Sequence, residues 1–433
     1  MAVTGSAVGI GNVWKFPYMA GANGGGAFVL VYLVCVLAIG LPVMMSEILI
    51  GRRGRRNPVA TMALLGQEEG GGRRWWLLGA LGVVAGILIL SYYSVVAGWT
   101  LAYALKSVAG EFTGASAASI AATFSAFTGD WKQVALAHTV FMVLTTMIIA
   151  RGVERGLEQA VQVMVPALLL LMLLLLTYAM TTGAFGEAVS FLFTPDFAAL
   201  GWNGALAALG QAFFSLSIGM GAVMAYGAYL PEETSITGAA ATVVIADSAI
   251  AVLSGLVIFP IVFANELNPA EGPGLVFNTL PVAFAEMPFG VAVGTPFFLL
   301  LVFAAWTSAL GLMEPGVAWL IERFQYTRLR AALLVGGLIW GLGFGTVLSF
   351  SELSTTTFLF GTIYDNVEYI TSNVMLPVSG IFIAIFAGWI MCRNSTAEEL
   401  GGSSGFYRPW RMLARYIAPA AITVVFLQAT GFL

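Results

Sequence analysis

Apolar residues along this chain gather in long runs, which are separated by short stretches rich in arginine, glycine or proline. A helix needs about 20 apolar residues to cross the roughly 30 Å of hydrocarbon in a bilayer, and runs of this length recur from one end of the chain to the other. The pattern predicts eleven membrane-spanning helices, at about residues 2–20, 26–51, 76–109, 133–150, 157–182, 202–229, 236–264, 291–321, 331–350, 363–391 and 410–432.

The composition indicates the same surroundings. Hydrophobic residues occupy 59% of the 433 positions and charged residues only 9%, and the mean hydropathy is +0.92. A single water-soluble core cannot bury so much apolar surface, so we expect an all-α integral membrane protein, one transmembrane domain over residues 1–433, in contact with membrane lipid. Cys35 and Cys392 are both expected within spans, so they do not indicate a disulfide framework.

The positions of the positive charges predict the orientation, because short loops rich in arginine and lysine stay on the cytoplasmic side. All fifteen arginines follow spans two, four, eight and ten: Arg52, Arg53, Arg55, Arg56, Arg73, Arg74, Arg151, Arg155, Arg323, Arg328, Arg330, Arg393, Arg408, Arg411 and Arg415. The amino terminus is therefore expected in the cytoplasm, and the carboxyl terminus outside with Lys106 and Lys132. Topology explains the basic segment "RRGRRNP" (52–58), and no nucleic-acid partner is expected.

Two glycine-rich interruptions occur in otherwise apolar spans. "GSAVGIGNVWKFP" (5–17) lies in span one and "SLSIGMGA" (215–222) in span six, so that Gly9 and Gly11 match Gly219 and Gly221 at an offset of 210 residues. Five helices lie within that offset, and an odd number reverses direction in the membrane. This is the pattern of inverted repeats in transporters, here 1–182 and 200–392 with an extra helix at 409–433. The alternative is that these glycines only allow close helix packing.

A break in the middle of a membrane leaves backbone N–H and C=O groups without partners, which costs several kcal/mol for each group in hydrocarbon. Protein, water or a ligand must satisfy these groups, so the breaks are expected to line a site. Amino ends of half-helices attract an anion, while freed carbonyl groups attract a cation. A substrate with a carboxylate and a sodium ion beside it meets both demands.

Three segments, "GSAVGIGNVWKFPYMAGANGGGAF", "QAFFSLSIGMGA" and "FAAWTSALGLMEP", resemble the neurotransmitter:sodium symporter family, in its bacterial amino-acid-transporter branch. The resemblance covers essentially the whole chain. It implies a LeuT-like fold with a 5+5 inverted repeat, broken helices 1 and 6, and sodium-coupled amino-acid symport by alternating access across a prokaryotic inner membrane. The chain differs in having eleven rather than twelve helices and no leader before span one, which suggests that a short cytoplasmic leader precedes it.

The resemblance also implies a set of ligands. Substrate contacts would come from Ala7, Gly9, Gly11, Ile89, Tyr93, Phe214, Ser215, Ser217, Met220, Ser308, Ala309 and Leu312. One sodium ion would bind Ala7, Asn12, Ser215 and Asp247, together with the substrate carboxylate, and a second would bind Gly5, Val8, Ala304, Thr307 and Ser308. Their oxygen atoms are hard ligands, as a small cation requires.

Two of these positions indicate the substrate and the ions more closely. Monoamine carriers of the family place an aspartate where this chain has Gly9, so the substrate is expected to bring its own carboxylate, as an α-amino acid does. The implied side-chain pocket is apolar, with Met220 as a flexible wall, so a hydrophobic or aromatic amino acid is expected. Chloride-dependent relatives lack an acid in the region of Asp247. An ionisable group within a span indicates function, and we expect Asp247 to make chloride unnecessary. The alternative is an acid that is merely solvated near the start of span seven.

The resemblance assigns gates and supports as well. Lys15 and Glu368 would form the outer gate, steadied by Gln211, while Tyr93 and Phe214 close over the substrate. Tyr229 and Glu322 would belong to the cytoplasmic closure. Glu47 would support the break of span six, and Gly156 and Pro166 would mark where span five unwinds. A lysine that snorkels to the membrane surface and an ordinary proline kink are the simpler alternatives.

No nucleophile elbow, phosphate-binding loop or cysteine cluster with metal-ligand spacing occurs in the sequence, so an enzyme is not expected. The single histidine, His138, is expected to be incidental. Two other functions stay open: an amino-acid sensor or channel on the same scaffold, and a symporter of a carboxylated osmolyte.

Overall fold

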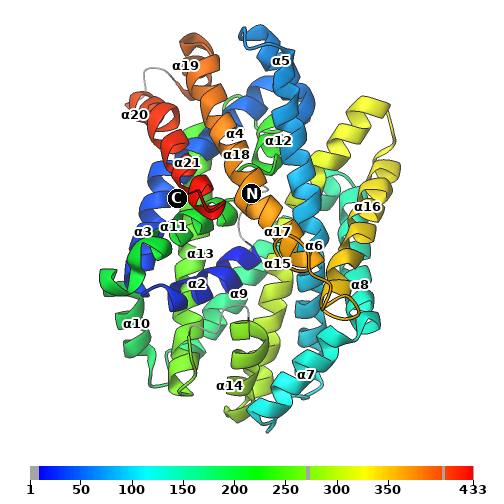
Figure 1. Cartoon of the computed structure of the whole chain (residues 1–433), viewed down its shortest axis with the longest axis vertical. Helices are drawn as coiled ribbons and strands as arrows, with labels where there is room; N and C mark the ends of the chain where they lie inside the picture. The colour runs from blue at the N-terminus through cyan, green and yellow to red at the C-terminus, as the bar shows by residue number, and fades with distance from the viewer. Residues whose placement is uncertain (1–8, 270–273, 402–404, 433) are drawn as a thin grey trace.

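The computed structural model of this chain describes residues 9–269, 274–401 and 405–432. In these ranges the secondary structure is helical, and no β-strand occurs. Most of the long helices run along the longest axis of the molecule (Figure 1). Gly5, Ala7 and Val8, which were expected to bind substrate or sodium, lie outside the described residues.

Nine helical stretches in the described ranges are long and apolar enough to cross a membrane, and they correspond to the predicted spans two to five and seven to eleven. Several contain short π- or 3-10-helical segments, labelled η. In chain order the stretches are α3 (Gly26–Cys35), η2 (Val36–Gly40) and α4 (Leu41–Gly54); η3 (Arg73–Trp75) and α6 (Trp76–Val108); α8 (Trp131–Ala150); η4 (Val153–Glu158) and α9 (Gln159–Ala179); α13 (Ile236–Ala264); α15 (Gly290–Phe324); α16 (Arg328–Ser349); α17 (Ile363–Tyr369), η6 (Ile370–Met375), α18 (Leu376–Ile385) and η7 (Phe386–Ile390); and α20 (Tyr407–Met412), η8 (Leu413–Ile417) and α21 (Ala418–Ala429).

Predicted spans one and six are the two for which the described residues include no long apolar helix that could cross a membrane by itself. The described part of span one consists of η1 (Gly11–Lys15) and α2 (Phe16–Ala22), and span six is divided into α11 (Phe197–Ser215) and α12 (Ala222–Ala228). Short helices that the apolar runs did not predict connect the spans: α5 (Pro58–Glu68), α7 (Ala117–Gly129), α10 (Phe185–Phe193), η5 (Leu275–Thr279), α14 (Leu280–Glu286) and α19 (Arg393–Leu400).

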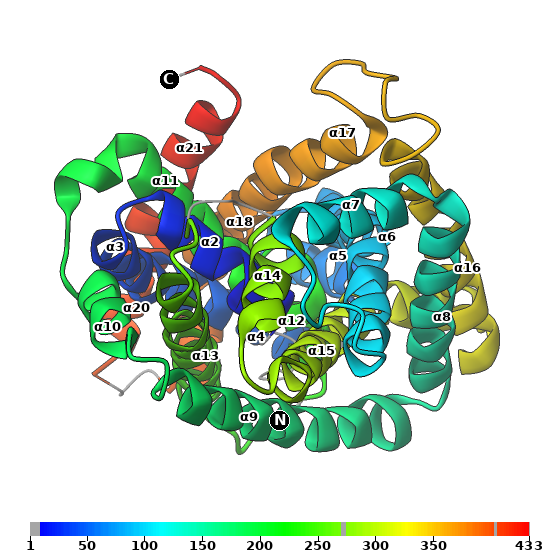
Figure 2. The ribbon, with the colours of Figure 1, turned by 90° about the horizontal axis from the view of Figure 1, so that it is seen from below.

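Burial is distributed as expected for a protein dissolved in lipid. Large apolar side chains such as Leu30, Val34 and Leu37 are exposed on the outside, whereas polar side chains such as Asn12 and Asp247 are completely buried. Viewed along the helices, α12 and α15 lie near the centre of the molecule, with α10 and α16 at opposite edges (Figure 2). The polar groups therefore gather inside the helix bundle, where only protein or a ligand can satisfy them.

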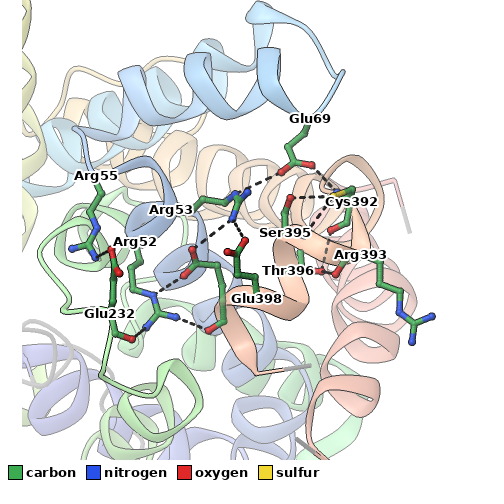
Figure 3. A network of polar contacts seen from close by, with 11 residues as sticks. Arg52, Arg53, Arg55, Glu69, Glu232, Cys392, Arg393, Ser395, Thr396 and Glu398 are labelled. Atoms are coloured by element: carbon green, nitrogen blue, oxygen red, sulfur yellow. Dashed lines mark hydrogen bonds and ion pairs between the residues drawn. The ribbon is translucent and has the colours of Figure 1, made fainter. Parts of the chain in front are cut away.

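Helix ends that carry arginine lie at one end of the molecule, with α5 and α19, and α7 and α14 lie at the other (Figure 1). Close by α19, Arg52 pairs with Glu399 at 2.7 Å, Arg53 with Glu398 at 3.2 Å, and Arg55 with Glu232 at 3.4 Å; Figure 3 shows this network.

The expected position of Cys392 within a span is wrong. The residue is exposed beyond η7, and its Sγ accepts a hydrogen bond from the Ser395 backbone N–H at the start of α19. The apolar run continues through Met391 and Cys392 to the start of α19, whereas the helix of the span ends at Ile390, so hydropathy alone placed the boundary too late.

Candidate functional site

The break in span six results from three residues with positive φ within five positions. Ser217 has φ 55°, Gly219 83° and Gly221 74°, a region that favours glycine, so the helix cannot continue beyond Ser215 and restarts at Ala222. The freed Gly219 N–H donates to Glu47 Oε1 at 2.6 Å. Glu47 is fully buried on α4, and it therefore satisfies a backbone group that would otherwise be unpaired in the membrane.

In span one the described helix begins at Ile10, directly after Gly9, and residues 1–8 lie outside the described residues. Neither Gly9 nor Gly11 has a positive φ, and both glycines allow a close approach instead. A Cβ atom on Gly9 would overlap Ser308 Oγ of α15, and one on Gly11 would lie 3.1 Å from Cδ1 of the Phe214 ring. The Gly11 carbonyl oxygen accepts a hydrogen bond from Gln211 Nε2 at 2.8 Å, so Gln211 of α11 supports the first turn of the described helix.

Asp247 of α13 lies at the centre of a buried polar cluster. Its Oδ1 accepts a hydrogen bond from Asn12 Nδ2 at 2.7 Å, and its Oδ2 accepts from Tyr32 OH at 2.9 Å and from Ser215 Oγ at 3.1 Å. The carboxyl group is completely buried, and within the part of the chain that the structure describes no lysine, arginine or histidine forms an ion pair with it. A carboxylate in this position lacks a counter-charge from the described residues.

Tyr32 of α3 is a member of this cluster that the sequence did not indicate. A tyrosine in the apolar run "VLVYLVC" carries no local sign of function, and only the packing of α3 against α11 and α13 reveals its contact with Asp247. By contrast, Asn12, Ser215 and Asp247, which the family resemblance brought together, are adjacent in the structure.

A small cavity adjoins the cluster, between the described start of span one, the break in span six and helices α6 and α15. Most of the expected substrate contacts line it, together with Asn12: Gly9, Gly11, Ile89, Tyr93, Phe214, Ser215, Ser217, Met220, Ser308 and Leu312. Ala309 is buried nearby but is not part of this lining. The buried Tyr93 hydroxyl lacks a hydrogen-bond partner of good geometry among the described residues, so a polar group of a ligand is able to reach it.

The residues expected at the second sodium site lie on one stretch of α15. Thr307 and Ala304 are completely buried, and Thr307 Oγ1 donates to the Ala304 carbonyl oxygen at 2.9 Å. Ser308 and Ala304 face Gly9, since the Cβ position of Gly9 points at Ser308 Oγ and lies 3.5 Å from the Ala304 carbonyl oxygen. Hydroxyl and carbonyl oxygens therefore converge beside Gly9, where the described part of span one begins.

On the outer side, the structure brings Lys15 and Glu368 to the same hollow, which Gln211 and Phe214 also line. In the described ranges no ion pair within 4.0 Å joins Lys15 to Glu368. Lys15 Nζ instead lies 4.2 Å from the centre of the Phe214 ring, a cation–π distance. Phe214 lines both this hollow and the small cavity, so it separates them.

On the arginine-rich side, Tyr229 and Glu322 do not contact each other directly. Glu322 accepts hydrogen bonds from the Asn57 backbone N–H at 2.8 Å and from Asn57 Nδ2 at 2.7 Å, and Tyr229 OH donates to Glu314 Oε1 at 3.4 Å. Glu314, completely buried on α15, forms an ion pair with Arg328.

The sequence analysis overlooked the pair of Glu314 and Arg328. The signal was present, because Glu314 is an ionisable residue within a predicted span, the same reason for which Asp247 was singled out. Arg328 Nε also donates to the Ile149 carbonyl oxygen at 2.8 Å, so the pair joins α15 and α16 to the end of α8.

Span five begins in η4. Gly156 lies within η4, and a Cβ atom there would overlap the Ile148 carbonyl oxygen. Pro166 lies inside the continuous helix α9. His138 is buried, and its Nε2 lies 3.1 Å from the Trp340 carbonyl oxygen.

Comparison of the chain with known proteins identifies a family. The sequence profile of the Sodium:neurotransmitter symporter family matches residues 1–126 and 123–431. The chain is 37% identical over 437 residues to the "Uncharacterized sodium-dependent transporter YhdH" of Bacillus subtilis, covering 100% of this chain and 96% of that protein. It is 25% identical to the "Sodium-dependent neutral amino acid transporter B(0)AT2" of Bos taurus, over 62% of this chain and 40% of that protein.

The fold is similar to the crystal structure of MhsT in complex with L-phenylalanine, with a TM-score of 0.91, 40% sequence identity, and coverage of 99% of this chain and 97% of that one. The expected fold class is thereby confirmed: an all-helical, LeuT-like membrane protein. The chain belongs to the sodium:neurotransmitter symporter family and is a sodium-dependent transporter.

Proposed function

We propose that this protein is a sodium-coupled symporter of a hydrophobic or aromatic amino acid, that it works by alternating access, and that it does not require chloride. The observation that carries the proposal is the completely buried Asp247 carboxyl group, which has no cationic partner in the described ranges and lies beside a cavity between the described start of span one and the break in span six. A buried carboxylate stays charged only beside a compensating cation, and we assign that role to the cargo sodium ion.

The cavity supports a substrate that brings its own carboxylate. The Cβ position of Gly9 is occupied by Ser308 Oγ, so this position has no room for an acidic side chain that would replace a missing carboxylate. Ile89, Met220 and Leu312 provide an apolar wall, and methionine adapts its shape to different ligands. The similar protein MhsT was crystallised in complex with L-phenylalanine, and phenylalanine is therefore the first substrate to test.

Two sodium sites follow from the oxygen atoms around the breaks. The first would use Asn12, Ser215 and Asp247 with Ala7, and the second would use the set Ala304, Thr307, Ser308, Gly5 and Val8. A neutral zwitterion carried with two sodium ions moves two charges. At about 100 mV this supplies roughly 4.6 kcal/mol, or about three decades of substrate accumulation, before any sodium gradient is counted.

The transport cycle would alternate between two closures. Phe214 and Tyr93 close over the substrate, and Lys15 would then leave the Phe214 ring to approach Glu368 above them. Opening on the arginine-rich side, which we place in the cytoplasm, would involve Tyr229 and Glu322, with Gly156 and Pro166 as the flexible part of span five. The two halves, 1–182 and 200–392, are proposed to be inverted repeats that move relative to each other.

Uptake into proteoliposomes tests the proposal. We expect labelled phenylalanine to accumulate when a sodium gradient is imposed, and to accumulate equally when gluconate replaces chloride. Binding of phenylalanine without accumulation would indicate a sensor. Downhill flux without uphill uptake would indicate a channel. Competition by glycine betaine, but not by leucine, tryptophan or tyrosine, would indicate an osmolyte carrier. A large loss of uptake without chloride would refute chloride independence.

A matched pair of glycine variants locates the site. Gly9→Ala places a methyl group on Ser308 Oγ, so we expect loss of phenylalanine binding. Gly210 lies on α11 with no heavy atom within 4 Å of its Cβ position, and we expect Gly210→Ala to bind phenylalanine within about twofold of the wild type. Equal binding by both variants would place the substrate elsewhere.

A further inference from the structure

A large hollow of about 810 Å³ opens at the arginine-rich end of the molecule, away from the cavity between the breaks. Helix α5, the beginning of α6 and the end of α15 enclose it, and α5 and α15 both pack against α6. Its lining includes Arg56, Arg73 and Arg323 beside the indole rings of Trp76 and Trp319. Nothing in the proposed transport cycle uses these side chains.

The charge in this hollow is not compensated by the described protein. Three arginines face one glutamate, Glu322, and both oxygens of that carboxylate already accept hydrogen bonds from Asn57. Among the described residues, Arg56, Arg73 and Arg323 form no ion pair. The hollow therefore offers guanidinium groups to an external anion.

The neighbouring arginines provide an internal comparison. Arg52, Arg53 and Arg55 lie just before the hollow in the sequence, and each pairs with a glutamate. The arginines of the hollow differ from these three, because the one carboxylate in the lining, Glu322, accepts hydrogen bonds from Asn57 and forms no ion pair with them among the described residues.

An apolar groove of about 410 Å³ continues from the hollow along α6, α15 and α16. The two share Val59, Trp76 and Trp319 in their linings. Val84 and Leu338 of the groove are 47% and 51% exposed, so the groove opens to the surroundings of the protein. These surroundings are hydrocarbon for a membrane helix.

We propose that the hollow and the groove together bind one phospholipid with an anionic phosphate headgroup. The guanidinium groups bind the phosphate, for which arginine offers paired donors in a planar fork, and an acyl chain lies in the groove. Tryptophan is enriched at the level of the headgroups, where Trp76 and Trp319 join the two parts. The positive-inside rule places this end at the cytoplasmic leaflet, whose anionic lipids attract arginine.

The site is tested with the full chain in detergent, by native mass spectrometry with added dioleoyl phosphatidylglycerol or dioleoyl phosphatidylcholine. We expect tighter binding of the phosphatidylglycerol. The double variant R73Q/R323Q is expected to bind it about 30-fold more weakly, because each arginine near an anionic lipid contributes about fivefold. The control R74Q/R408Q changes the charge equally but lies outside the hollow, and we expect a change of less than about twofold.

Two further measurements distinguish a lipid from a free anion. Ala80→Phe fills the groove without touching the arginines, and we expect it to weaken phosphatidylglycerol binding at least fivefold, while inorganic phosphate does not compete. If R73Q/R323Q fails to fold, judged by phenylalanine binding, R73K/R323K keeps the charge but loses the planar fork, and we expect intermediate binding.

Three results would overturn the proposal. Equal binding of the two lipids by the wild type would remove the headgroup preference. Equal losses in the two double variants would indicate attraction to net charge rather than a site. Competition by inorganic phosphate, with no effect of Ala80→Phe, would indicate a site for a soluble anion.

Discussion

The charge of Asp247 makes the sharpest test of the sodium site. Asp247→Asn keeps the size of the side chain and removes its charge, and an amide still accepts hydrogen bonds through one oxygen. Because the carboxyl group is completely buried and accepts hydrogen bonds from the neutral groups of Asn12, Tyr32 and Ser215, its charge is available to a bound cation. The variant therefore separates electrostatic attraction from packing.

The size of the effect follows from Coulomb's law. Two opposite unit charges about 4 to 6 Å apart, at an effective dielectric constant of about 20, attract each other by roughly 3 to 4 kcal/mol. We expect Asp247→Asn to weaken sodium binding by about 100- to 1,000-fold. Tyr32→Phe is the matched control, because it removes one hydrogen bond to the same carboxylate and keeps the charge. Its sodium affinity should stay within about tenfold of the wild type.

The assay is the sodium concentration that gives half-maximal binding of labelled phenylalanine, measured in chloride and in gluconate. Asp247→Ser also removes volume at the carboxylate, and we expect its binding to improve when chloride is present, since a bound anion would replace the missing charge. A half-maximal sodium concentration for Asp247→Asn within threefold of the wild type would refute the assignment of Asp247 to a sodium site.

Two further predictions concern stability, both measured as the thermal unfolding temperature in detergent. Glu47→Ala leaves the Gly219 N–H without its partner and should lower the free energy of unfolding by about 1–3 kcal/mol. The control Glu68→Ala, at the exposed end of α5, should change the unfolding temperature little. Equal shifts of the unfolding temperature in the two variants would contradict a supporting role for Glu47. Arg328→Gln leaves the buried Glu314 without its counter-charge and should cost about 3–5 kcal/mol. Adding Glu314→Gln should recover part of that loss, and a double variant as unstable as the sum of the single ones would exclude the coupling.

The sequence by itself determined the surroundings of the chain and the order of its helices. Runs of about 20 apolar residues are a local property, so nine spans could be read directly, and the break in span six was visible as Gly219 and Gly221. Short polar helices such as α19 escaped notice, because they carry no apolar run.

Only the tertiary structure shows why glycine occurs at the matching positions of spans one and six. The paired glycines look alike in the sequence, yet Gly219 and Gly221 adopt a positive φ, whereas Gly9 makes room for Ser308. Both a positive backbone angle and the close approach of another helix favour glycine. A single sequence does not show which of these two reasons applies.

Side-chain partners were likewise a matter of packing. Tyr32 meets Asp247 across 215 positions of the chain, and Lys15 lies over Phe214 rather than within ion-pair distance of Glu368 in the described structure. Hydropathy fixes which segments enter the membrane, but it carries no information on which faces of those helices meet. In a bundle where every polar group must find a partner inside, that choice of faces decides where ions and substrate bind.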